Sequence, residues 1–205
     1  MSRRARGEAS SRGTAARRRW LPALGGAALL AAAWGLAAVT PGDDAAERPF
    51  VVEAAPGERA EGRNLAIVVT GLAAARTVVD GGWRAEGDWL VVELEAEAVV
   101  AEQAALLGSA VLEFDGRSYR ASERPPGSLL RTALAVGLPR SGAVAFELPP
   151  GTFDAAAAEG AAPASLAFAI SADTRLDSLL VVPFDLAQLE PSGEVELPRI
   201  DWAGS

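Results

Sequence analysis

The chain of 205 residues has no cysteine and no histidine, and all 19 of its basic residues are arginine. Without cysteine there can be no disulfide, no thiolate nucleophile, no lipid-modified cysteine and no zinc–thiolate cluster. Without histidine there can be no Ser-His-Asp triad and no imidazole metal site. These absences exclude several common classes of enzyme and metalloprotein before any motif is considered.

The charge is distributed very unevenly along the chain. Residues 1–20 carry seven Arg against one Glu, a charge of about +6, whereas residues 41–205 carry twelve Arg against 26 acidic residues, about −14. Between these two regions, residues 21–39 contain no charged side chain. A helix of that length spans about 28 Å, which is close to the hydrocarbon thickness of a bilayer.

This pattern predicts a membrane anchor. Arginines precede the apolar segment and acids follow it, so the positive-inside rule predicts a cytoplasmic N-terminus and an exported C-terminus. We expect a disordered basic cytoplasmic tail at 1–19 and an uncleaved transmembrane signal anchor at 20–40, with the lipid bilayer as its partner. A cleaved signal peptide and a buried soluble helix are the alternatives. A tail next to a membrane suits anionic lipid better than nucleic acid, and no nucleic-acid partner is expected.

The exported region has the pattern of an all-β protein. Residues 41–63 are rich in Gly, Pro, Ala and acidic residues, which predicts an extracytoplasmic linker. From Asn64 onward, short strand-like runs alternate with turns, and the long crossover helices of a parallel sheet are not visible. We expect an antiparallel immunoglobulin-like β-sandwich of about seven to nine strands at 64–189. Residues 190–205 would form a C-terminal tail or an edge strand.

Several local features refine this expectation. The sequence "AVLEFDGRSYRAS" predicts a hairpin, because Asp115-Gly116 suits a two-residue turn in which both residues have positive φ. "GGWRAEGDW" at 81–89 is expected to turn, and 129–138 to be an extended run. An Ala-rich stretch at 154–159 predicts a short helix.

Three of these segments together resemble a known family. The matching residues are Trp89, Leu90, Val91 and Val92, then Asp115, Gly116, Arg117 and Tyr119, then Gly142, Phe146, Leu148 and Pro149. In this respect the chain resembles the DUF4352-type and related immunoglobulin-like extracytoplasmic domains of Gram-positive, actinobacterial-type bacteria. It departs from them by lacking a polar turn after the Trp strand and by having a longer connection at 150–164. The resemblance implies an anchored sandwich without known catalysis and identifies no active-site residues.

The strand "GDWLVVELEAEAVV" at 87–100 raises the question of a site. Its period-two alternation places Glu93, Glu95 and Glu97 on one face, about 7 Å apart. A solvated outer face is favoured, with a surface for a basic partner or a calcium site as alternatives, although calcium needs six or more oxygens. Arg117 and Arg120 belong to an exported basic cluster that could meet an anionic wall polymer or simply balance nearby acids. These five residues are the candidate partner surface.

The sequence therefore favours a non-enzymatic interaction or accessory module in the cell envelope, held by a single span in the cell membrane. Its partner would be an envelope or membrane protein, including a transport or export system. The alternatives are a wall-polymer or small-ligand binding domain and an envelope hydrolase that uses paired carboxylates. We expect no cofactor, no metal ligand and no catalytic residue.

Overall fold

The computed structural model describes residues 26, 29–35, 48–100, 105–175 and 177–204. The chain divides into two compact units, Met1–Glu47 and Arg48–Ser205. In the first unit, the described residues are helical. Within the described ranges, no helix has both the length and the apolar character needed to cross a membrane. The tail expected at 1–19 and most of the anchor expected at 20–40 lie outside the described residues, so both stay predictions.

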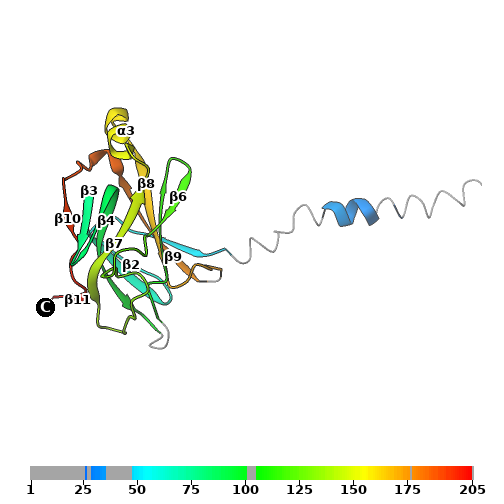
Figure 1. Cartoon of the computed structure of the whole chain (residues 1–205). Coiled ribbons are helices and arrows are strands. Elements are labelled where there is room, and N and C mark those ends of the chain that lie inside the picture. Colours follow the sequence, from blue (N-terminus) through cyan, green and yellow to red (C-terminus); the bar gives the residue numbers. More distant parts are fainter. Residues whose placement is uncertain (1–25, 27–28, 36–47, 101–104, 176, 205) are drawn as a thin grey trace, which may run out of the picture. The chain divides into compact units, whose positions relative to one another are not determined.

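The second unit is a β-sandwich of two sheets (Figure 1). The five strands of the first sheet, in spatial order, are β1 (Phe50–Glu53), β9 (Ser178–Asp185), β8 (Pro163–Ala169), β5 (Ser109–Phe114) and β6 (Arg117–Arg120). The second sheet has the order β10 (Val195–Glu196), β3 (Leu65–Asp80), β4 (Trp83–Ala98), β7 (Arg140–Leu148) and β11 (Asp201–Trp202), and β2 (Arg59–Glu61) also pairs with β3. Helix α3 (Thr152–Glu159) follows β7, and the 3-10 turn η1 (Leu186–Gln188) follows β9.

The folded unit begins before residue 64, which the sequence predicts as its start. Strands β1 and β2 lie in the expected linker at 41–63, because Val52 packs against the core and Ala60 is buried. At the C-terminal end, the edge-strand alternative is confirmed, since β10 and β11 pair at opposite edges of the second sheet. The described residues therefore form eleven strands. The β1–β9 and β10–β3 pairs are parallel, and every other strand pair is antiparallel.

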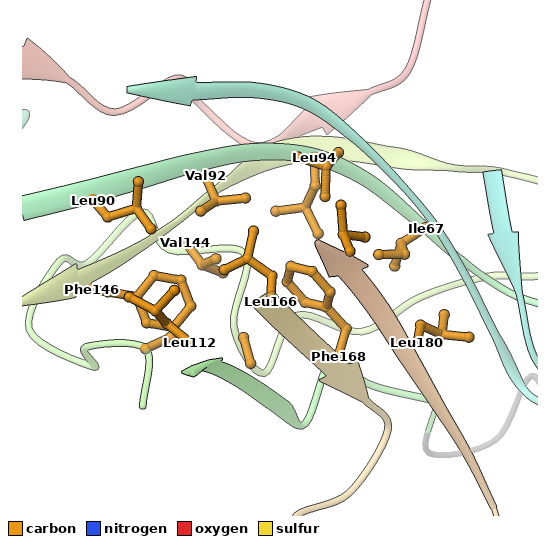
Figure 2. Close-up of a cluster of buried hydrophobic side chains, with 14 of the residues drawn as sticks. Ile67, Leu90, Val92, Leu94, Leu112, Val144, Phe146, Leu166, Phe168 and Leu180 are labelled. Carbon is orange, nitrogen blue, oxygen red and sulfur yellow. The ribbon is translucent and has the colours of Figure 1, made fainter. Parts of the chain in front are cut away.

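The core lies between the two sheets. Strand β4 directs Leu90, Val92 and Leu94 inward, as its alternation predicts, and all three are buried. Figure 2 shows these side chains facing others from both sheets, among them Phe146 on β7 and Phe168 on β8. Each large side chain buried in this way stabilises the fold by about 1.5–3 kcal/mol. The sandwich thus derives most of its stability from one continuous apolar layer.

Part of the outer face of the second sheet is also buried. Trp89 and Val91, on the outward parity of β4, are completely buried in a second cluster that includes Leu197 from the C-terminal segment. The Trp83 ring meets Trp89 edge-on, with centroids 5.9 Å apart. The guanidinium of Arg124 lies over both rings, at 5.6 and 5.7 Å from their centroids. This second cluster attaches the C-terminus and the 122–128 loop to the sandwich.

Two local predictions were wrong, while the helix predicted at 154–159 is confirmed as the larger part of α3. Residues 129–138 form no strand and make only isolated bridges, because Arg131 and Gly137 have positive φ values of 63° and 70° that break the extended run. The turn expected at 81–89 is limited to Gly81-Gly82. Trp83 already belongs to β4, since it pairs with Asp80 of β3.

Candidate functional site

The strand registers define two ends of the sandwich. The cleft end carries the β5–β6 turn, Pro163 at the start of β8 and helix α3, which contacts η1. The entry end carries Phe50, which pairs with Ser178, and Asn64, whose side chain donates to Asp177 at 3.2 Å. Figure 1 shows α3 and β6 together at the cleft end. The two ends face in opposite directions along the strands.

The β5–β6 hairpin forms one wall of a cleft at the cleft end. Asp115 and Gly116 have φ values of 51° and 67°, which are the positive values that a type I′ turn requires. Strand pairing continues from Phe114–Arg117 down the hairpin, so the predicted two-residue turn is confirmed. This tight turn fixes the position of Arg117 at the start of β6.

Helix α3 forms the opposite wall, and a buried carboxylate holds its first turn in place. Asp88 accepts a hydrogen bond from the backbone N–H of Thr152 at 3.0 Å, and its other oxygen pairs with Arg76. Arg76 also reaches Asp154 in the first turn of α3, at 2.6 Å. The pKa of Arg76 is raised, chiefly by the Asp88 hydrogen bond. The start of the helix is therefore fixed to the second sheet.

The chain that leaves α3 is held by a second carboxylate. Asp185, at the end of β9, accepts backbone hydrogen bonds from Ala162 at 2.8 Å and Ala187 at 3.0 Å. These bonds, the Ala162 bond most of all, lower the pKa of Asp185 below its ordinary value. Because Ala162 lines the cleft, both the beginning and the end of this wall are tied to the β-sheets.

Between the hairpin and α3 lies an open cleft of about 550 Å³. Its polar lining comes from Asp115, Arg117, Tyr119, Thr152 and Glu159, and its apolar lining includes Phe114, Pro149, Pro150 and Pro163. A second hollow of about 460 Å³ lies beside the same turn and also includes Arg117. We refer to the larger hollow as the hairpin–helix cleft. Its walls can offer a cation, a phenol and a carboxylate to one ligand.

Arg117 is the residue of this cleft that is best placed to meet an anionic group. Its side chain is 70% exposed, and its ion pair with Asp115 spans 3.7 Å. Such an exposed and loosely paired arginine contributes little to stability. It is therefore available for a ligand at little cost to the fold.

The predicted glutamate face is present, but its three members differ. Glu93 is exposed, Glu95 is half-buried and Glu97 is buried in an ion pair with Arg59. Arg59 also donates to Glu61 at 3.0 Å. Burial lowers the pKa of Arg59, but its bonds to Glu61 and Glu97 outweigh this and raise it. Glu97 thus links β4 to β2 through Arg59 and is not a solvated carboxylate.

The structure does not bring the five candidate residues together. The glutamates lie on β4 in the second sheet, whereas Arg117 and Arg120 lie on β6 at the edge of the first. Arg117 lines the hairpin–helix cleft, and Arg120 is exposed at the other end of its strand. In the part of the chain that the structure describes, no three acidic residues are grouped so that they could hold a metal ion.

Sequence reasoning did not foresee Thr152 and Glu159 as neighbours of Arg117. No local signal could have found them, since the position of α3 across the cleft from the hairpin depends on how the two sheets pack. Tyr119 was more accessible to prediction, because it is the single tyrosine of the chain and follows the hairpin turn closely.

The comparisons with known proteins give a limited result. No protein-family model matches the chain, and the search of curated proteins finds no relative. Among solved structures, the chain is similar to an uncharacterized β-sandwich protein from Clostridium difficile 630. The identity is 11%, the TM-score is 0.47, and the match covers 67% of this chain and 97% of the other. The sandwich itself is defined by the strand pairing described above.

Proposed function

We propose that this protein is a non-enzymatic, membrane-anchored module of the cell envelope that binds a partner protein in its hairpin–helix cleft. The observation that carries the proposal is the cleft itself, whose two walls are fixed by the type I′ turn and by Asp88. It presents Arg117 and Tyr119 beside several prolines. Arg and Tyr are enriched at protein–protein interfaces and among the residues that dominate binding energy.

The membrane part of the proposal is supported by the sequence. The uncharged segment 21–39 follows a basic tail and precedes an acidic region, which is the charge order of a signal anchor with an exported C-terminus. In this proposal the sandwich is of the immunoglobulin-like kind and resembles the DUF4352-type envelope domains. The partner would be an envelope or membrane protein, such as a component of a transport or export system.

The test uses variants of the cleft. Arg117 is exposed, whereas Tyr119 also packs against the core, so the folding of each variant is checked by circular dichroism before retention is compared. The tagged full-length chain, purified in mild detergent from its own membranes, should retain a stoichiometric partner. Arg117→Glu and Tyr119→Ala should each reduce the retained partner at least tenfold, because hot-spot truncations cost about 2 kcal/mol or more. Arg120→Glu is the matched control, since Arg120 is also exposed on β6 but does not line the cleft. Equal retention by all three variants would contradict the proposal.

A second candidate function is the binding of a small ligand or wall polymer. The cleft volume of about 550 Å³ falls within the usual range of small-molecule sites, about 300–1,000 Å³. In that case the purified chain, without any protein partner, would bind a purified anionic wall polymer, and Arg117→Glu would weaken the binding. Partner retention that persists after removal of all polymer would favour the first candidate.

A further inference from the structure

The exposed large apolar side chains of the sandwich gather at one end. In the described residues of the second unit there are six such side chains, with exposed fractions from 39% to 71%: Phe50, Val51, Val100, Val136, Leu138 and Trp202. Single exposed apolar residues are normal on a protein surface, but a gathered set marks an interaction site. We call these six residues the apolar rim.

Strand register places every member of the rim at the entry end. Phe50 and Val51 begin β1, and Val100 comes just after the end of β4. Val136 bridges to Ala98 at that same end of β4. Leu138 lies two residues before β7, and Trp202 pairs with the first residue of that strand. No member of the rim lines the hairpin–helix cleft.

The connection to the N-terminal segment points to what covers the rim. The uncharged segment ends at Val39, and only the ten residues 40–49 separate it from Phe50. Ten residues reach at most about 36 Å when fully extended. If residues 21–39 span the bilayer, the rim is thus always within a few tens of ångströms of its surface.

The aromatic members of the rim are each accompanied by an arginine. The guanidinium of Arg63 lies 5.3 Å from the centre of the Phe50 ring, and that of Arg140 lies 4.3 Å from the Trp202 ring. In the described part of the chain, Arg140 forms no ion pair, and its buried Nε has no hydrogen-bond partner. Tryptophan favours the headgroup level of a membrane, and arginine there can meet lipid phosphates while its stem stays in apolar surroundings.

We propose that the entry end of the sandwich rests on the outer surface of the bilayer, with the apolar rim inserted at the level of the lipid headgroups. The inference builds on the membrane anchoring in the proposed function. It makes the sandwich a module with a fixed orientation, which holds the hairpin–helix cleft on the side away from the membrane. The anchor keeps the sandwich near the bilayer, and the apolar rim sets how the sandwich is oriented on it.

The test uses the absence of cysteine, because any single introduced cysteine can be spin-labelled uniquely. The full-length chain is reconstituted in liposomes of phosphatidylcholine and phosphatidylglycerol, with a nitroxide at one position at a time. Val136→Cys and Leu138→Cys probe the rim, Ser118→Cys probes the cleft end, and Leu30→Cys probes the anchor. Collision with oxygen, which concentrates in lipid, is compared with collision with a water-soluble nickel chelate.

We expect the oxygen-to-nickel ratio at positions 136 and 138 to exceed that at position 118 several-fold, with a still higher ratio at position 30. A high ratio at position 30 with aqueous values at the rim would overturn docking and leave the anchor standing. An aqueous value at position 30 would remove the anchor, and the inference with it. Labels at the rim that are shielded from both reagents would show contact with a second protein, which also overturns lipid docking.

A charged variant gives an independent check. With the nitroxide at Val100→Cys, the added pair Val136→Asp and Leu138→Asp should lower the ratio at position 100 to that of position 118. All three positions are exposed in the sandwich, so these changes leave its core intact. An unchanged ratio at position 100 would contradict insertion of the rim.

Discussion

At the scale of single residues, Asp88 makes the most consequential polar contact. Its carboxylate is buried on β4 and holds both the guanidinium of Arg76 and the backbone N–H of Thr152. Asp88→Ala leaves that N–H and part of the guanidinium without an acceptor. We expect the free energy of unfolding to fall by about 1.5–3 kcal/mol, the usual range for hydrogen bonds to a charged group. Urea unfolding of the 48–205 unit, followed by tryptophan fluorescence, measures the change.

The matched control for this prediction is Asp154→Ala. Asp154 pairs with the same Arg76, but its side chain is 70% exposed. Exposed ion pairs contribute at most about 1 kcal/mol, so this variant should unfold close to the parent protein. If the two variants lost equal stability, Asp88 would not be the group that fixes the start of α3.

At the scale of elements, the β5–β6 hairpin depends on the backbone of its turn. Gly116 has a φ of 67°, where a side chain is strained, and a Cβ there would meet no other atom within 4 Å. Gly116→Ala should therefore cost about 1–2 kcal/mol through backbone strain alone. The same substitution should also weaken partner retention, because the turn positions Arg117 in the hairpin–helix cleft.

The other hairpin provides the control for that prediction. Gly82 is in the β3–β4 turn, outside the left-handed region, and a Cβ at this position would also meet no atom within 4 Å. We expect Gly82→Ala to be neutral in the same urea experiment. A loss at Gly82 as large as the loss at Gly116 would show that strain in the type I′ turn is not the cause.

Elements with a strong local signal could be predicted from the sequence. The alternation of Leu90, Val92 and Leu94 identified the inner face of β4, and Asp115-Gly116 identified the hairpin. The long-range parts could not be predicted in this way. Trp89 and Val91 are on the outward parity of β4, yet they are buried because the distant C-terminal segment covers them.

The candidate site shows the same limit. The alternation placed Glu97 on the outer face of β4, but no local pattern shows that Arg59, from a stretch expected to be a linker, pairs with it. Arg117 could be recognised as an exposed arginine beside a turn. Its position in a cleft depends on α3, which follows β7 in the other sheet. Sequence reasoning therefore found residues of the site but not the site itself.

At the scale of the whole molecule, the proposed anchor predicts a definite topology. The test uses cells of the native host whose cytoplasmic membrane is closed but whose outer envelope lets a protease through. The added protease should remove the sandwich and spare a tag at residue 1. The reason is the charge order of the chain, with seven arginines before the uncharged segment. The result is read from the size of the tagged fragment, and cells lysed before treatment serve as the control. A digested tag with an intact sandwich would mean the reverse orientation.

The parallel pairing of β1 with β9 has a mechanical consequence for an anchored protein. Four residues of β1, from Phe50 to Glu53, run alongside Ser178–Val181, with backbone hydrogen bonds at both ends of the pairing. A partner that pulled on the cleft end while the N-terminal segment stayed fixed would stretch the molecule along this strand. The hydrogen bonds between β1 and β9 would then be loaded in shear, so they would have to break together instead of one at a time. If the proposed anchor holds the N-terminal segment, β1 is thus the strand that would bear the tension.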